Sequence, residues 1–179
     1  MTLQVTPIHS AAENCFTYLA TDPRTRCCAV INPLPGTLNA VNAAIDAGGL
    51  ICEWVLGTGH DSKASLAARA LTERHICART AGPDGAGYQL SLADDHCVRV
   101  GHVHGRVVLQ DGHASYVFDG KIFSGCCVTA HVTVGRADPL HRLQDDFSVL
   151  LHQPVEETAP MDSYQRSLGE LRSSPPIVI

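Results

Sequence analysis

The distribution of apolar and polar positions first predicts a β-hairpin near the N-terminus. Residues 14–20 and 26–32 form apolar or alternating runs, and a polar stretch around Asp22-Pro23 separates them. Proline fixes φ and aspartate bonds to its own backbone, so Asp-Pro between such runs favours a turn. We therefore expect two antiparallel strands here.

A helical period replaces this pattern after residue 37. Apolar side chains recur at helical spacing beyond Thr37, which is a suitable N-cap, and the repeat stops at Gly48-Gly49, a favoured helix end. The elements predicted next are a buried strand over residues 50–56, a helix over about 62–75 and a strand over 76–79. The turn over residues 57–64 thus follows the carboxyl end of a buried strand, where α/β sheets commonly place their sites.

The second half of the chain is dominated by short alternating runs. A glycine-rich loop over residues 81–87 precedes them, and Asp119-Gly120 between two of them is a strong hairpin signal. The strands predicted here cover residues 98–100, 103–109, 115–118 and 121–124. Beyond Pro139 the period becomes helical again, which predicts C-terminal helices within residues 139–172 and a tail over 173–179.

Composition narrows the class of protein. The 179 residues fit a single domain over residues 1–179, 45% of them are hydrophobic, and the formal net charge of -5 comes without a basic block. We therefore expect neither nucleic acid nor an anionic membrane as a partner. No apolar run is long enough to span a bilayer, and the first residues lack the features of a signal peptide, so we expect a cytoplasmic protein.

The eight cysteines make the chain cysteine-rich, but none of them forms a C-x-x-C motif. In a reducing cytosol most of them should be thiols. Cys15, Cys52, Cys77 and Cys97 lie in apolar runs, where a thiol usually packs as a small core residue. We expect these four to be buried.

Several short segments carry a family resemblance. They are Asn14–Ala20 with Asp22-Pro23, Ala29–Pro33, Val55–Thr58, Tyr116–Gly120 with Phe123–Gly125, and Gly135–Asp138. In this order and at these spacings, the chain resembles the metallo-β-lactamase fold superfamily over residues 14–138, and within it the glyoxalase II and persulfide dioxygenase-like branch. The resemblance implies an α/β fold, a four-layer αββα sandwich of two mixed β-sheets flanked by helices, here with a shortened C-terminus.

The same resemblance implies a metal site whose ligands this chain has lost. The branch binds one or two metal ions with a Thr-His-x-His-x-Asp-His loop, and the ions generate hydroxide or bind oxygen. Thr58 is retained. The ligand positions carry, in order, Gly59, Asp61, Lys63, Ala64, Leu109 and Cys126. Glycine, alanine and leucine have no ligating atom, and a lysine ammonium has no lone pair, so we expect neither the ancestral mechanism nor its cofactor.

Cys126 is the candidate nucleophile, because the resemblance places it at the floor of the former metal pocket. Close to His60 or His113 its thiolate would be favoured, and Lys63 would act in the same sense. Asp61 with His60 could bind a proton or a cation. The other residues that we assign to this pocket are Thr58, Gly59, Leu109, His113 and Cys127. The alternatives are that Cys126 only fills space and that Asp61 only caps the following helix.

His102 and His104 form a second candidate, an H-x-H pair that would face one side of a strand. With His96 or Cys126 as a third ligand, the pair could bind a transition metal. Zinc or iron is therefore expected only at such a relocated site. The alternative is an exposed polar face of the sheet.

Three functions are compatible with these observations. The first is a degenerate, metal-free pseudoenzyme of this fold, which is not a hydrolase and binds a small molecule, another protein or a second copy of itself. The second is a thiol-based sulfur-transfer or redox protein that uses Cys126. The third is a residual glyoxalase II-like metallohydrolase with its site relocated to His102 and His104.

Overall fold

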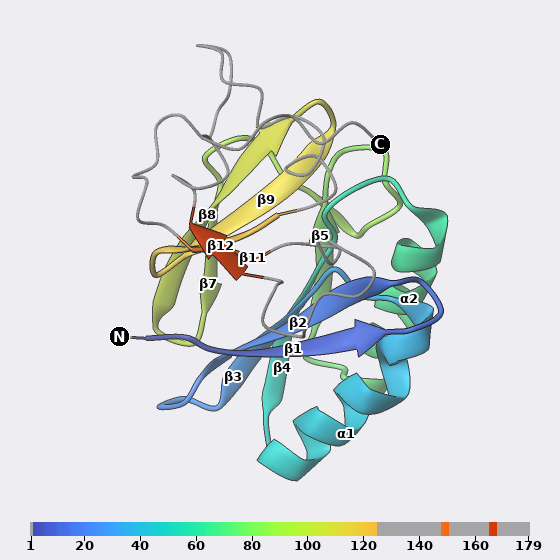
Figure 1. Ribbon diagram of the computed structural model, residues 1–179, viewed down its shortest axis with the longest axis vertical. Coiled ribbons are helices and arrows are strands. Elements are labelled where there is room, and N and C mark those ends of the chain that lie inside the picture. The colour runs from blue at the N-terminus through green and yellow to red at the C-terminus, as the bar shows by residue number, and fades with distance from the viewer. Residues whose placement is uncertain (1, 125–147, 151–164, 168–179) are drawn as a thin grey trace.

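The computed structural model describes residues 2–124, 148–150 and 165–167. Two six-stranded sheets face each other, and two helices cover the outer side of the first sheet (Figure 1). The first sheet has the order β1-β2-β3-β4-β5-β6, and the second has the order β12-β11-β10-β9-β8-β7. The predicted sandwich of two mixed sheets with flanking helices is confirmed.

The first sheet begins with antiparallel strands and continues with parallel ones. Its strands are β1 (Gln4–Ser10), β2 (Cys15–Asp22), β3 (Cys27–Ile31), β4 (Ile51–Leu56), β5 (Arg79–Gly82) and β6 (Leu90–Ser91). β1, β2 and β3 pair antiparallel, whereas β3 to β6 pair in parallel. Parallel neighbours need crossover connections, and α1 (Leu38–Gly48) and α2 (Ser62–Arg74) supply two of them.

Strand β2 is buried along its whole length because both of its faces meet hydrophobic layers. Phe16 and Tyr18 belong to the core between the two sheets. Leu19 belongs to a second core, where it joins Val41 of α1 and Leu71 of α2. Alternate residues of a strand point to opposite faces, so a strand covered on both sides is a continuous apolar run.

The second sheet is built mainly from consecutive hairpins. Its strands are β7 (Cys97–Val100), β8 (Val103–Gln110), β9 (His113–Phe118), β10 (Lys121–Phe123), β11 (Ser148–Leu150) and β12 (Gln165–Ser167). Only the β10–β11 pairing is parallel. Asp119-Gly120 closes β9–β10 as predicted, with φ angles of 47° and 72°. Asp111-Gly112 closes β8–β9 in the same way, because two successive positive φ angles give the type I′ turn that hairpins favour.

The N-terminal region differs from the prediction in two ways. Strand β1 was not predicted, because it is an edge strand of mixed burial that contains Pro7, and proline is tolerated only at such edges. Thr37 is the N-cap residue of α1 as predicted, but its side chain makes no capping hydrogen bond, because Thr37 also ends a short 3-10 turn, η1 (Pro35–Thr37). Its Oγ1 donates to the Leu34 carbonyl (2.9 Å) and contacts Thr17 Oγ1 (2.8 Å) instead.

The strand predicted over residues 76–79 lies three residues later, at Arg79–Gly82. Helix α2 ends at Arg74, and a tight turn follows in which the Ala78 amide donates to the His75 carbonyl at 2.8 Å. This turn leaves Ile76 90% exposed. The apolar residue that suggested a strand is therefore a surface residue.

The prediction for the C-terminal region is wrong wherever the structure describes it. Residues 148–150 and 165–167 form strands β11 and β12 and complete the second sheet, whereas helices were expected across residues 139–172. The hydrophobic spacing around Leu150 fits both kinds of element, and strand pairing with β10 decides between them. The rest of residues 139–172 and the tail over 173–179 lie outside the described residues.

Of the four cysteines that were predicted to be buried, two are buried. Cys15 and Cys52 are buried, with 6% and 3% of their surface exposed. Cys77 and Cys97 are exposed, so their assignment to the core is wrong. Cys77 follows Ile76 in the surface turn after α2, and Cys97 lies on the face of β7 that points away from the core.

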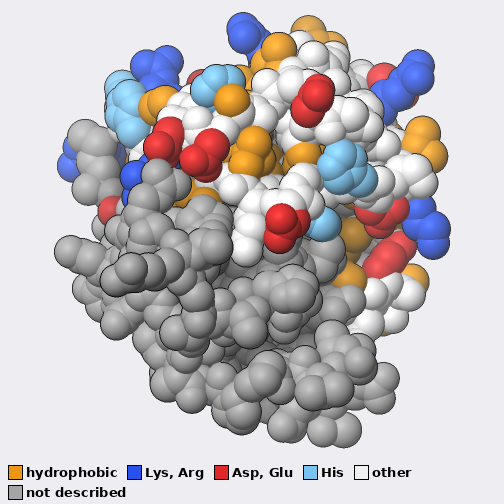
Figure 2. All heavy atoms as spheres, turned by 90° about the horizontal axis from the view of Figure 1, so that it is seen from above, with side chains coloured by type: hydrophobic (Ala, Val, Ile, Leu, Met, Phe, Trp, Pro, Cys, Tyr) orange, Lys and Arg blue, Asp and Glu red, His pale blue; other side chains and the backbone are white. Residues whose placement is uncertain are grey.

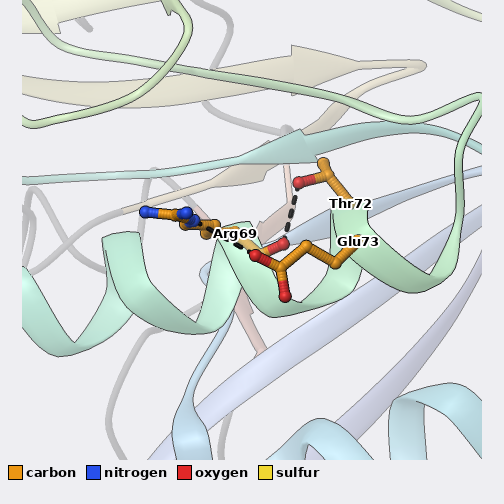
Figure 3. Close-up of polar contacts among 3 residues, drawn as sticks. All are labelled: Arg69, Thr72 and Glu73. Atoms are coloured by element: carbon orange, nitrogen blue, oxygen red, sulfur yellow. Dashed lines mark hydrogen bonds and ion pairs between the residues drawn. The ribbon is translucent and has the colours of Figure 1, made fainter.

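The outer face of α2 carries the polar residues of an ordinary surface helix (Figure 3). Arg69 Nε and Glu73 Oε1 are 3.2 Å apart in an i, i+4 ion pair, and Thr72 Oγ1 donates to the Arg69 carbonyl at 2.9 Å. Such an exposed pair stabilises a helix by only about 0.3–0.5 kcal/mol. Neither helix that the structure describes is long and apolar enough to cross a membrane.

Candidate functional site

The loop over residues 57–61 joins the end of β4 to the start of α2 and lies against the β8–β9 turn. The Ala114 amide of β9 donates to the Thr58 carbonyl at 2.9 Å, so a hydrogen bond links the loop of the first sheet to the second sheet. The β8–β9 turn lies at the top of Figure 1. Figure 2 looks down on that end of the molecule and shows histidine side chains beside acidic ones.

Two histidines make a crossed contact where the loop meets the turn. A Cβ added to Gly59 would lie 2.9 Å from Cδ2 of His113, and a Cβ added to Gly112 would lie 3.1 Å from Nε2 of His60. Each ring therefore packs on the glycine that precedes the other histidine. The ring centroids are 6.4 Å apart with the planes at 89°. We call these residues, Gly59, His60, Gly112 and His113, the crossed glycine–histidine contact.

The hydrogen bond of His113 determines which ring nitrogen carries the proton. Its Nδ1 lies 3.1 Å from the Asp111 carbonyl oxygen, which can only accept. Nδ1 must therefore carry the proton, and in the neutral ring Nε2 keeps its lone pair. His113 can thus accept a hydrogen bond from a ligand through Nε2, and the side chain is only half-buried.

A buried polar network holds the loop from below. Thr58 Oγ1 donates to Asn32 Oδ1 at 3.3 Å, and Asn32 Nδ2 donates to the Phe16 carbonyl at 2.7 Å. Asn32 adopts a left-handed φ of 56°, and its own carbonyl accepts from Thr17 Oγ1 at 2.8 Å. Asparagine tolerates this backbone conformation better than most residues. The retained Thr58 is thus a structural anchor of the loop.

Two tyrosines form the floor beneath Gly57. Tyr116 is fully buried and donates from its hydroxyl to the Gly57 carbonyl at 2.5 Å. The ring of Tyr88 packs on Gly57 and Gly82, and an added Cβ at either glycine would overlap it. Among the described residues, the Tyr88 hydroxyl is buried without a hydrogen-bond partner.

Both phenols stay protonated at neutral pH. Burial raises the pKa of Tyr88 to about 12, and the nearby Asp61 charge adds to the increase. Burial also raises the pKa of Tyr116 well above its usual value, and Tyr88 adds to that effect. The floor is therefore neutral, and the charged groups of the site lie at its surface.

The acidic residue of the loop, Asp61, lies at the start of α2. Asp61 is the N-cap, and its Oδ1 accepts from the Lys63 amide at 2.8 Å. Asp61 and Lys63 are exposed at the surface, whereas Ala64 is buried with 5% exposure. The structure therefore agrees with the capping alternative for Asp61 that the sequence left open.

Replacing Asp61 with alanine should destabilise the protein by about 1 kcal/mol, because the Lys63 amide at the start of α2 loses its acceptor. Replacement with asparagine, which also caps well, should cost only a few tenths of a kcal/mol. Urea unfolding followed by circular dichroism measures both. Equal losses for the two variants would show that the charge of Asp61, not its cap, stabilises this region.

Comparison with known proteins adds information only at the level of structure. No protein-family model matches the sequence, and neither does any curated protein. ETHE1 from Myxococcus xanthus superimposes with a TM-score of 0.77 at 20% identity, over 97% of this chain and 82% of that one. The BLEG-1 B3 metallo-beta-lactamase gives 0.71 at 14% identity, over 93% and 95%. A Staphylococcus aureus metallo-beta-lactamase gives 0.71 at 12% identity, over 95% and 62%.

These superpositions cover nearly the whole chain at high TM-scores. The chain has the metallo-β-lactamase fold. The fold expected from the short sequence segments is therefore confirmed. At identities of 20% and below, the likeness concerns the fold and leaves the activity of this chain to be argued from its own residues.

The metallo-β-lactamase fold implies a metal site at the loop between β4 and α2, and the residues of this loop do not fit one. Gly59 has no side chain, Ala64 is apolar and buried, and Asp61 Oδ1 is engaged by the Lys63 amide. Across residues 2–124, 148–150 and 165–167, no three His, Cys, Asp or Glu side chains gather as a metal-binding group. The donor set therefore disagrees with the metal site of the fold.

The H-x-H pair does not share one strand face as expected. His102 lies in the turn before β8, where its amide donates to Asp22 Oδ2 at 2.9 Å. His104 lies on the exposed face of β8, with Nδ1 3.7 Å from Cys97 Sγ. His96 is engaged elsewhere, since its Nδ1 accepts from the Ala93 amide at 3.0 Å.

The remaining sequence candidates divide into described and undescribed residues. The structure brings the rings of His60 and His113 together and places the half-buried Leu109 against the core between the sheets. The Leu109 amide donates to Asp94 Oδ1 at 3.0 Å. Cys126 and Cys127 lie outside the described residues, so the nucleophile assigned to Cys126 stays a prediction.

The sequence did not reveal Tyr88 and Tyr116, the two tyrosines that form the floor of the site. Tyr88 follows the predicted loop over 81–87, and nothing near it in the sequence marks it as buried. The usable signal was the pair of glycines at strand ends, Gly57 and Gly82, because a glycine there often marks a close approach by another group. Which group approaches depends on strands far apart in the sequence.

Proposed function

We propose that this protein is a binding module built on the metallo-β-lactamase fold that works without the metal site of that fold. The observation that carries the proposal is the structure of the loop at residues 58–64. Thr58 is hydrogen-bonded to Asn32, Asp61 caps α2, and Ala64 is buried. A hydrolase of this fold needs metal ligands at these positions, and here the same positions serve to hold the loop in place.

The ligand would bind at the surface end of the loop, next to His60 and His113. His60 is exposed, and His113 offers Nε2 as an acceptor. The T-shaped arrangement of the two rings presents both a ring face and polar edges. These properties suit a small polar molecule with a hydrogen-bond donor.

The loop is held rigidly enough to act as a binding surface. Its backbone is tied to Tyr116 through Gly57 and to Ala114 through Thr58, and both partners belong to β9. A site that is ordered before the ligand arrives loses less entropy on binding. This arrangement supports recognition, which requires a preformed surface but no reactive group.

The histidine ring signals in an NMR spectrum test the proposal. We expect the purified protein to contain no stoichiometric zinc or iron by elemental analysis. We also expect small alcohols and amides at millimolar concentration to shift the ring signals of His60 and His113. The ring of His96, whose Nδ1 accepts from the Ala93 amide and which makes no contact with either site histidine that the structure describes, serves as the internal control.

Two results would contradict the proposal. One is one equivalent of metal that survives dialysis and disappears in the His60→Ala/His113→Ala variant. The other is a set of ligand-induced shifts that affect His96 as strongly as the two site histidines. The first result would restore a metalloenzyme, and the second would show that these compounds bind without selectivity.

A further inference from the structure

The outer face of the β7–β8 hairpin carries a square of four reactive or cationic side chains. Cys97 lies opposite Arg106, and Arg99 lies opposite His104 in the antiparallel register. Residues two apart on a strand share a face, so all four side chains project to the same side. All four are exposed, while the intervening residues Val98 and Val100 are buried on the inner face. We call these four residues the thiol–arginine square.

A direct contact joins the nucleophile and the base of this square. Cys97 Sγ lies 3.7 Å from His104 Nδ1, within hydrogen-bond range for sulfur. In the tautomer that carries its proton on Nε2, His104 can accept the thiol proton through Nδ1. A cysteine beside such an acceptor and beside cations matches the environment in which thiolates form.

The two arginines are largely available to an incoming anion. Arg106 Nη1 lies 3.8 Å from Asp95 Oδ1, a long ion pair between exposed groups. Arg99 takes part in none of the ion pairs among the described residues. The square therefore presents two guanidinium groups on the same face as one thiol, and among the described residues Asp95 is the one acid in an ion pair with it.

The hairpin that carries the square is fixed to the first sheet. Trp54 Nε1 donates to the Arg99 carbonyl at 2.9 Å, and the Gly101 amide donates to Glu53 Oε2 at 2.9 Å. At the same end, the His102 amide donates to Asp22. Main-chain bonds to β4 and β2 thus keep the four side chains in register.

We infer that Cys97 is a site of thiol–disulfide exchange with small disulfides that carry carboxylates. The Cys97 thiol passes its proton to His104 Nδ1, and the Sγ electron pair forms a bond to one sulfur of the disulfide. The disulfide S–S bond breaks, and the leaving thiolate departs with that electron pair and recovers the proton from His104. The products are a mixed disulfide on Cys97 and one free thiol, so the incoming disulfide is itself the oxidant.

Charge favours this chemistry over metal binding at the same residues. Cys97 and His104 supply only two ligands, and two guanidinium groups beside them repel a metal cation. The same two groups attract a carboxylate and orient it through paired N–H donors. The site is separate from the crossed glycine–histidine contact and does not depend on the function proposed for it.

The experiment compares two small disulfides of opposite charge. The dianion 5,5′-dithiobis(2-nitrobenzoate) and the dication cystamine are reacted with the native protein, and the labelled peptides are quantified by mass spectrometry over time. We expect Cys97 to react with the dianion at least about tenfold faster than Cys77, the other exposed thiol of the described chain, because of its base and its cations. Cystamine should show no such preference.

Variants separate the contribution of the two arginines from that of His104. Arg99→Gln/Arg106→Gln should reduce the dianion-to-dication rate ratio at Cys97 by about tenfold at low salt. The control Arg69→Gln/Arg74→Gln removes the same charge from α2 and should leave that ratio unchanged. His104→Gln should slow the reaction of Cys97 with both probes at neutral pH, because the thiol loses the acceptor for its proton. Equal rates at Cys97 and Cys77, or a ratio that the two arginines do not affect, would overturn the inference.

Discussion

Gly57→Ala should lower the free energy of unfolding by about 3 kcal/mol, the upper end of the usual cost of overpacking. The added Cβ would lie under 3.0 Å from Cζ and Oη of Tyr88, a separation that real Cβ atoms essentially never show. The ring cannot move away easily, because it also packs against Gly82. The loop cannot rise easily either, because the Gly57 carbonyl accepts from the buried Tyr116 hydroxyl.

Urea unfolding of a double-mutant cycle measures this effect. Tyr88→Leu removes the outer ring atoms that the new Cβ would meet and keeps an apolar side chain in the space. Adding Gly57→Ala to Tyr88→Leu should therefore cost at least 2 kcal/mol less than adding it to the native protein, on the order of the overpacking term itself. Strictly additive costs would mean that Gly57 is required for another reason than the approach of Tyr88.

Asn32→Ala should destabilise the protein by a similar amount, about 3 kcal/mol. The variant leaves the buried Phe16 carbonyl without the Asn32 amide and Thr58 Oγ1 without its acceptor, at about 1–3 kcal/mol for unsatisfied buried groups. It also places alanine at a φ of 56°, which costs about 1–2 kcal/mol. The free energy from urea unfolding gives the sum.

Asn32→Gly separates the cost of the lost hydrogen bonds from the cost of the left-handed backbone conformation. Glycine adopts a φ of 56° without steric cost, so it should be less damaging than alanine by about 1 kcal/mol. Both variants should also loosen the loop, which faster hydrogen exchange at the Gly57 and Ala114 amides would report. If glycine and alanine proved equally destabilising, the left-handed conformation would not be part of the cost.

Short sequence motifs correctly predicted the strands and helices whose ends are determined by neighbouring residues. Asp22-Pro23 and Asp119-Gly120 marked hairpin turns, and Gly49 ends α1 in the left-handed conformation with φ 54°. Strand β5 was misplaced because an apolar residue, Ile76, stands in the turn after α2. Strand β11 was missed because its pairing partner β10 lies more than 20 residues earlier in the chain.

In the candidate site, too, features set by neighbouring residues could be predicted and features set by distant residues could not. The strand, turn and helix that frame residues 57–61 could be predicted from sequence, whereas their register with a metal-binding loop stays a prediction. The packing of Tyr88 on Gly57 could not be predicted, because it depends on how β4, β5 and the loop before β6 meet in space. Exposure of Cys97, by contrast, was within reach of the sequence, since Arg99 shares its face of β7 and Val98 and Val100 mark the opposite face as the buried one.

The crossed glycine–histidine contact has a consequence for the order in which the protein folds. The β8–β9 and β9–β10 hairpins each close a two-residue turn, so they can form early and independently. Gly59 lies in the loop after β4 of the first sheet, His113 begins β9 of the second sheet, and the two are 54 positions apart, which the numbering gives as 113 minus 59. Closing so long a loop costs more chain entropy than closing a hairpin. The two imidazoles should therefore come together only when the sheets dock, after the hairpins have formed.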